Sequence, residues 1–230
     1  GRAPDWRRLG IVALIGVLLA VGALGVASLL DDPVGESAPD AARPAVGGSV
    51  AGLAPTTTTA PDPSNAELPP FATVLERPLP DGLSEVPAEQ AIAPLSRRVA
   101  AQRSARRLVE LAVGYQRVGR PDSAEPLFRE ALRLSPGYLP ARVGLAMVPG
   151  GRDDAGLTQS QSTLTALRRE YPRSQMVVFN QAWAALYRRD GEVAFPALRA
   201  TVRLGPDSFL GAVAASLLAA AKGQGAASGP

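Results

Sequence analysis

Apolar residues follow three different patterns along the chain. Residues 9–30 form an apolar run without a charge, residues 31–94 carry scattered apolar positions, and residues 95–222 show apolar positions at helical spacing. We therefore expect a short N-terminus at residues 1–8, a transmembrane helix at 9–30, a disordered linker at 31–94, an all-α domain at 95–222 and a flexible tail at 223–230.

The apolar run is long enough to cross a bilayer, because its 22 residues would extend about 33 Å as a helix. Arg7 and Arg8 precede the run, and Asp31 and Asp32 follow it. The positive-inside rule therefore predicts a single-pass protein with a cytoplasmic N-terminus and an extracytoplasmic domain. The alternative is a signal peptide cleaved near "VAS" at residues 26–28, which would give a secreted binding protein. The chain does not begin with Met, which leaves open a longer cytoplasmic part.

Charge divides the chain in the same way as hydrophobicity. The expected linker is rich in Pro, Thr and Ala and has two arginines against ten acidic residues. The region from residue 95 onward has eighteen arginines and one lysine against ten acidic residues. An acidic linker therefore leads into a basic domain.

Residues 111–136, "LAVGYQRVGRPDSAEPLFREALRLSP", predict two antiparallel helices. Small residues would let the helices approach closely, aromatic residues would fill the space between turns, a glycine would form the connection and a proline would end the second helix. These positions are Ala112, Tyr115, Gly119, Ala124, Phe128, Ala131 and Pro136.

This spacing resembles the tetratricopeptide repeat, a helical hairpin of about 34 residues. Weaker copies follow, since Pro136, Pro172 and Pro206 are spaced by 36 and 34 residues. In the second copy, "PGG" at residues 149–151 should end the first helix early. The stretch at residues 207–223 reads as one closing helix that would cover the last apolar face. The resemblance implies a solenoid of about three repeats with a capping helix.

The register of the third copy stays open at this point. The proline spacing puts Ala182 and Ala194 at the small-residue positions. Aligning the copies on Gly191 instead puts Trp183, with Ala184 and Tyr187, at the contact positions. The sequence does not choose between these two alignments.

The resemblance also implies a binding module, in which the first helices of successive repeats contact a partner. The matching positions are Arg106, Val109, Val113, Gln116, Arg117, Val143 and Met147, and, with the proline register, Met176, Phe179 and Trp183. For Trp183 the alternative is core packing. The family's chaperone-binding members hold a C-terminal carboxylate with lysine and asparagine, but here Val109 and Val113 replace these residues. An apolar surface rimmed by arginine better suits an amphipathic or acidic segment of another protein.

The amino-acid composition offers little support for catalysis. The chain has no cysteine and no histidine, and no nucleophile or phosphate-binding motif stands out, so we expect no enzyme activity, no metal and no cofactor. A cluster of arginines at residues 97–107 would suit anionic lipid or a cell-wall polymer, or would only solvate a helix, and we expect no nucleic-acid partner. The favoured function is a membrane-anchored protein-interaction scaffold of a bacterial envelope complex, of unknown oligomeric state.

Overall fold

The structure, a computed structural model, describes the backbone of residues 70–227 and the side chains of residues 70–221. This part of the chain is all-α, as predicted, and contains no strand. It has two short 3-10 helices, η3 (Pro80–Gly82) and η4 (Pro149–Gly151), and eight α-helices. The α-helices are α2 (Ala88–Ala101), α3 (Ala105–Arg117), α4 (Pro121–Leu134), α5 (Leu139–Met147), α6 (Asp154–Glu170), α7 (Gln175–Tyr187), α8 (Gly191–Leu204) and α9 (Phe209–Ala227).

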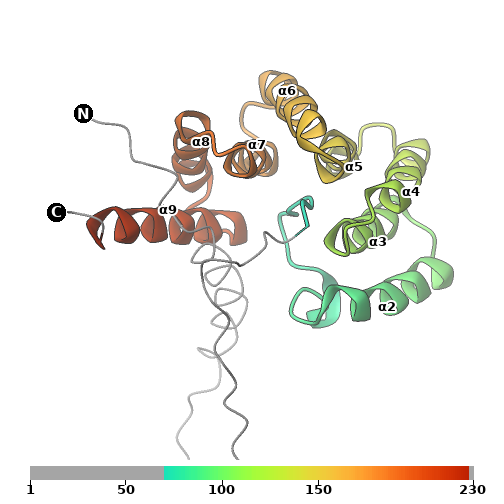
Figure 1. Cartoon of the computed structure of the whole chain (residues 1–230). Coiled ribbons are helices and arrows are strands. Elements are labelled where there is room, and N and C mark those ends of the chain that lie inside the picture. The colour runs from blue at the N-terminus through green and yellow to red at the C-terminus, as the bar shows by residue number, and fades with distance from the viewer. Residues whose placement is uncertain (1–69, 228–230) are drawn as a thin grey trace, which may run out of the picture.

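The helices follow one another around an arc (Figure 1), and each packs mainly against its neighbours in the sequence. Short turns connect α3 with α4 and α7 with α8, and a longer stretch that contains η4 connects α5 with α6. In the second pair, α5 ends at Met147, just before η4, as the "PGG" motif predicts. Asp153 then begins α6, because its Oδ1 accepts a hydrogen bond from the Gly156 N–H at 2.6 Å.

The hairpin α3–α4 recurs as α7–α8 at a spacing of 70 residues. Ala105 and Gln175 begin the first helices, and Pro121 and Gly191 begin the second ones. Both second helices also carry an internal proline at the equivalent place, Pro126 in α4 and Pro196 in α8. The third copy therefore follows the proline register.

The turns of the two hairpins have the same backbone geometry. Gly119 has a φ of 69° and donates its N–H to the Gln116 carbonyl at 2.9 Å. Arg189, which is 70 residues later, has a φ of 57° and donates to the Leu186 carbonyl at 2.9 Å. Both hairpins therefore have a left-handed residue in the turn. In the first hairpin this residue is a glycine, which favours the conformation, and in the third it is an arginine.

Close contact between the helices depends on alanine, as predicted. Ala112 and Ala124 are fully buried in the first hairpin, and the equivalent Ala182 and Ala194 are fully buried in the third. Phe128 of α4 is also fully buried and lies against Gly144 of α5, where an added Cβ would meet the ring at 2.2 Å. Side chains of this kind set how closely the hairpins stack.

Two expected domain boundaries are wrong. The linker was expected to reach residue 94, but α2 begins at Ala88 and the preceding residues Phe71, Thr73 and Leu79 are buried. Pro69, Pro70 and Pro78 interrupt this stretch, so it shows no helical period of its own, and Phe71, Thr73 and Leu79 become buried only against other helices. At the other end, α9 continues to Ala227, past the expected end of the domain at residue 222.

The expected transmembrane helix at residues 9–30 and the linker up to residue 69 lie outside the described residues. Within the described range, no helix is long and apolar enough to cross a membrane.

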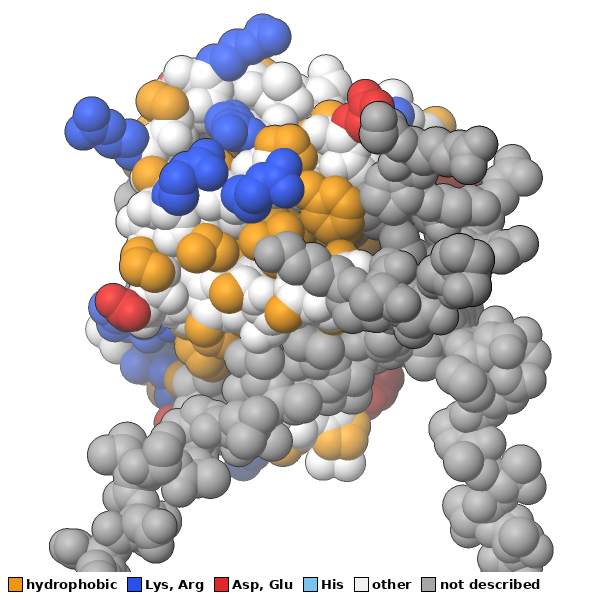
Figure 2. Space-filling model, turned by 90° about the vertical axis from the view of Figure 1, so that its left-hand side faces the viewer, with side chains coloured by type: hydrophobic (Ala, Val, Ile, Leu, Met, Phe, Trp, Pro, Cys, Tyr) orange, Lys and Arg blue, Asp and Glu red, His pale blue; other side chains and the backbone are white. Residues whose placement is uncertain are grey.

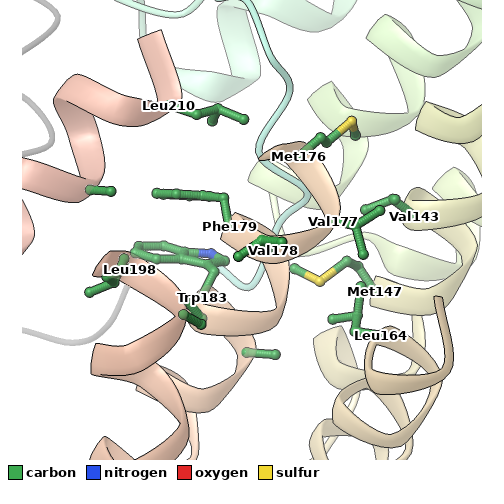
Figure 3. Packing of buried hydrophobic residues seen from close by; sticks show 14 of the residues in the cluster. Val143, Met147, Leu164, Met176, Val177, Val178, Phe179, Trp183, Leu198 and Leu210 are labelled. Carbon is green, nitrogen blue, oxygen red and sulfur yellow. The ribbon is translucent and has the colours of Figure 1, made fainter. Parts of the chain in front are cut away.

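The core consists of two clusters of buried apolar side chains. One contains α2, α3 and α4 residues such as Leu95 and Leu108. The other is centred on α7, where Phe179 and Trp183 lie near Leu198 of α8 and Leu210 of α9 (Figure 3). The partly buried Leu75 packs against both clusters, so residues before α2 connect the two halves of the core.

Candidate functional site

Residues 70–75, which we call the central segment, lie on the inner side of the arc of helices (Figure 1). This stretch is neither helix nor strand. Phe71 and Thr73 are buried, whereas Glu76, Arg77 and Pro78 immediately after the segment are exposed. The inner side of the domain therefore already holds an extended piece of polypeptide.

Two side-chain amides hold the backbone of the central segment. The Thr73 N–H donates to Gln116 Oε1 of α3 at 3.0 Å. The Val74 N–H donates to Asn180 Oδ1 of α7 at 2.9 Å, and Asn180 Nδ2 donates back to the Val74 carbonyl at 2.8 Å. Because these bonds involve backbone groups, they would hold an extended segment of many different sequences.

Phe71 supplies the aromatic anchor of the central segment. Its ring meets Tyr187 edge-on at 5.0 Å between centroids, and Tyr187 meets Trp183 at 5.2 Å. Gly150 of η4 gives this ring its space, because an added Cβ there would lie 2.5 Å from Phe71 Cε1. Burial raises the pKa of Tyr187 above its ordinary value. Phe71 thus lies in an apolar pocket, and residue 150 must be a glycine for the ring to fit there.

A second contact fixes the chain just before α2. The guanidinium of Arg117 donates to the carbonyls of Leu83, Ser84 and Val86 at 2.8, 3.0 and 3.3 Å. Burial lowers the pKa of Arg117, although an arginine stays charged at all ordinary pH values. Three carbonyls on one guanidinium hold residues 83–86 against α3, independently of the central segment.

Eight of the ten residues predicted to bind a partner are buried. They are Val109, Val113, Gln116, Val143, Met147, Met176, Phe179 and Trp183. Of these, Gln116 contacts the central segment directly, and Trp183 belongs to the aromatic row that ends at Phe71. The other six belong to the two core clusters.

The two predicted rim arginines already have contacts within the chain. Arg117 holds residues 83–86, as described above. Arg106 is exposed, and its Nε donates to Glu110 Oε1 at 2.8 Å, one helical turn away. The two guanidinium groups therefore contact different parts of the chain, and the structure does not bring them together as one rim.

Sequence reasoning missed Phe71 and Asn180. Phe71 stood in the expected linker. Asn180 had a usable signal, because it is a polar residue inside the apolar helix sequence "QMVVFNQAWAALY", and a buried amide needs hydrogen-bond partners.

The arginines differ in whether they make an ion pair within the described residues. In the cluster at residues 97–107, Arg98 pairs with Asp81, Arg103 with Glu130 and Arg106 with Glu110. Other exposed arginines, at several places in the domain, make no ion pair with any residue that the structure describes, and four of them lie around α8. These four are Arg188, Arg189, Arg199 and Arg203. Figure 2 shows basic side chains gathered beside apolar ones on the α8–α9 side of the domain.

Among the described residues, no group of carboxylates is placed to hold a metal ion. The contacts at the inner side are backbone hydrogen bonds and apolar packing, which recognise an extended polypeptide. No protein-family model matches this chain, and no curated protein sequence matches it.

Proposed function

We propose that this chain is a membrane-anchored protein-interaction scaffold of the bacterial cell envelope, with a domain of the tetratricopeptide-repeat type. The observation that supports the proposal best is the extended segment on the inner side of the arc. Gln116 and Asn180 hold its backbone there, as a binding protein would hold a peptide.

The repeat assignment has support of its own. The first and third hairpins are 70 residues apart, which is two units of about 35 residues, close to the repeat length of the family. The equivalent alanines are buried where the family packs small residues. A solenoid of this type presents one continuous inner surface, which suits an elongated partner segment.

The membrane assignment rests on the apolar run at residues 9–30 and on the charges that flank it. With the domain outside the cytoplasm, the partner is another protein of the envelope. A reporter active only outside the cytoplasm, fused after residue 227, should be active. Activity of a cytoplasm-specific reporter at that place would contradict this topology.

In-cell photo-crosslinking tests the scaffold function. A photoreactive residue replaces Glu76, which is exposed beside the central segment, and a matched control replaces Leu134, which is 54% exposed at the end of α4. We expect discrete crosslinked products with envelope proteins at residue 76 and none at residue 134. Absence of any product at residue 76 in intact cells would contradict the proposal.

The arginines around α8 favour a second candidate function, binding to anionic lipid or a cell-wall polymer. These charges make no ion pair with the described residues and lie on one face, so they are available to an anionic surface. We expect the full chain, reconstituted in vesicles with anionic lipid, to be protected from proteolysis near α8, and the same chain in zwitterionic vesicles to be cleaved. Equal cleavage in both would remove this candidate.

A further inference from the structure

We infer that the central segment occupies a partner-binding site on the inner side of the arc, and that it is displaced by a segment which fits this site better. The displacing segment is an extended stretch of a partner protein with an aromatic residue at the Phe71 position and an asparagine or aspartate two residues later. This inference rests on the proposed binding function and adds the recognition chemistry and a competing internal ligand.

The central segment fits its site incompletely. The Thr73 hydroxyl and Gln116 Nε2 are both buried, and neither makes a hydrogen bond within the described residues. Only the Oε1 atom of Gln116 bonds to the central segment, where it accepts a hydrogen bond from the Thr73 N–H. An unsatisfied buried donor is costly, and a ligand that satisfies it avoids this cost. The Thr73 hydroxyl oxygen does not bond to Gln116 Nε2, since both atoms lack a partner. The side-chain oxygen of an asparagine or aspartate lies one bond farther from the backbone, so we expect one of these residues at the Thr73 position to accept the free N–H of Gln116.

The aromatic requirement comes from the pocket around Phe71. Tyr187 forms one wall of the pocket at 5.0 Å, and Gly150 leaves the space that the ring fills. The Phe71 ring fills the space beside Gly150, because an added Cβ there would lie 2.5 Å from the ring. A smaller side chain than phenylalanine would leave this space empty. The pocket therefore selects for a planar apolar side chain.

The central segment is able to leave without unfolding α2. Arg117 fixes Leu83, Ser84 and Val86, and Ser84 Oγ accepts the Leu79 N–H at 2.6 Å. The exposed residues 76–78 then form the connection at which the segment separates from this fixed part. Because the central segment belongs to the same chain as its site, it competes with a partner segment at an effective concentration of about millimolar. It therefore blocks partner segments that bind weakly, and a partner segment that binds more tightly displaces it.

A disulfide lock tests the displacement. A Cβ at Gly119 would lie 4.0 Å from Pro70 Cβ, within the roughly 3.5–4.5 Å of a disulfide, and the chain has no cysteine of its own. The variant Pro70→Cys with Gly119→Cys is prepared in the full chain and compared in its oxidised and reduced forms. Because both forms carry the same two substitutions, any strain at the left-handed Gly119 is common to them.

The probe is a fluorescent peptide with the sequence of residues 68–79, "LPPFATVLERPL", in which asparagine replaces the threonine. We expect the reduced form to bind it at least tenfold more tightly than the oxidised form. We also expect at least fivefold weaker binding of the peptide that keeps threonine, and no binding of the asparagine peptide with alanine in place of phenylalanine. Equal binding by the oxidised and reduced forms would overturn the inference, and so would no binding of the asparagine peptide by the reduced form.

A second measurement covers the case in which the double variant does not fold. The substitution Trp6→Phe leaves Trp183 as the single tryptophan of the full chain. Trp183 contacts Tyr187, which in turn contacts Phe71. We expect the unlabelled asparagine peptide to change Trp183 emission and the alanine peptide to leave it unchanged, and no change with either peptide would overturn the inference. Covalent dimers in place of locked monomers would show that the segment comes from a second copy, which also overturns it. Crosslinking from residue 76 that persists after such a failure would leave the scaffold function standing with another binding surface.

Discussion

Asn180 on α7 forms two hydrogen bonds with the backbone of Val74, a residue 106 positions earlier in the chain. Its Oδ1 accepts from the Val74 N–H, its Nδ2 donates to the Val74 carbonyl, and Nδ2 also donates to the Met176 carbonyl of its own helix at 2.8 Å. One fully buried amide thus connects the start of the domain with its third hairpin.

Replacing Asn180 by alanine should lower the free energy of unfolding by about 2–4 kcal/mol, because it leaves both Val74 backbone groups unsatisfied. Urea unfolding of the full chain followed by circular dichroism measures the change. Gln159→Ala on α6 is the control, since Gln159 is exposed and should change stability by less than about 0.5 kcal/mol. Equal effects of the two substitutions would show that the contact with Val74 contributes nothing.

Arg117 provides the second prediction. Arg117→Ala removes three hydrogen bonds to the carbonyls of residues 83–86 and should destabilise the domain by about 2–4 kcal/mol, with faster hydrogen exchange around those residues. Arg199→Ala, at an exposed arginine of α8, is the matched control and should be nearly neutral. If both variants unfold at the same denaturant concentration, Arg117 does not hold this stretch.

The pocket for Phe71 predicts that alanine substitutions at two separate glycines, Gly150 and Gly137, have different effects on stability. Gly150→Ala would place a Cβ 2.5 Å from the Phe71 ring and should cost about 1–3 kcal/mol through overpacking. Gly137→Ala adds the same methyl group where no atom lies within 4 Å, so it should leave stability almost unchanged. Thermal unfolding of both variants measures the difference, and equal melting temperatures would mean that Phe71 does not fill this pocket.

Tyr187 makes stability depend on alkaline pH. Burial raises its pKa in the folded chain, whereas in the unfolded chain it titrates near its usual value of about 10. Above pH about 10 the unfolded chain therefore loses this proton first, and stability falls by up to about 1.4 kcal/mol per pH unit. The stabilisation is complete below this range and decreases as pH rises through it.

Tyr187→Phe should make this alkaline loss smaller, which denaturant unfolding at pH 8 and pH 11 measures. Some loss should remain, because burial also raises the pKa of Tyr138. An alkaline loss as steep as in the unchanged chain would show that Tyr187 ionises as easily in the folded state as in the unfolded one.

The sequence by itself determined the helical hairpins. Ala112 and Ala124 mark close contacts between α3 and α4, Pro149 ends α5 early, and the stretch from residue 207 forms one closing helix, α9. These features are readable because helical period, turns and caps depend on residues within a few positions of one another. The fold class followed from such local signals.

Only the tertiary structure decided what occupies the inner side of the arc. The ring of Phe71 packs against Tyr187, which is 116 positions later in the chain, so its burial follows only from where the hairpins place the pocket. In the same way, Arg103 looked like part of a free basic cluster until α4 placed Glu130 beside it. The predicted contact residues on α3, α5 and α7 share helical faces, but a helical face does not reveal whether it meets solvent or the chain's own remaining residues. That outcome depends on long-range packing, which places residues 70–75 against side chains more than 40 positions away.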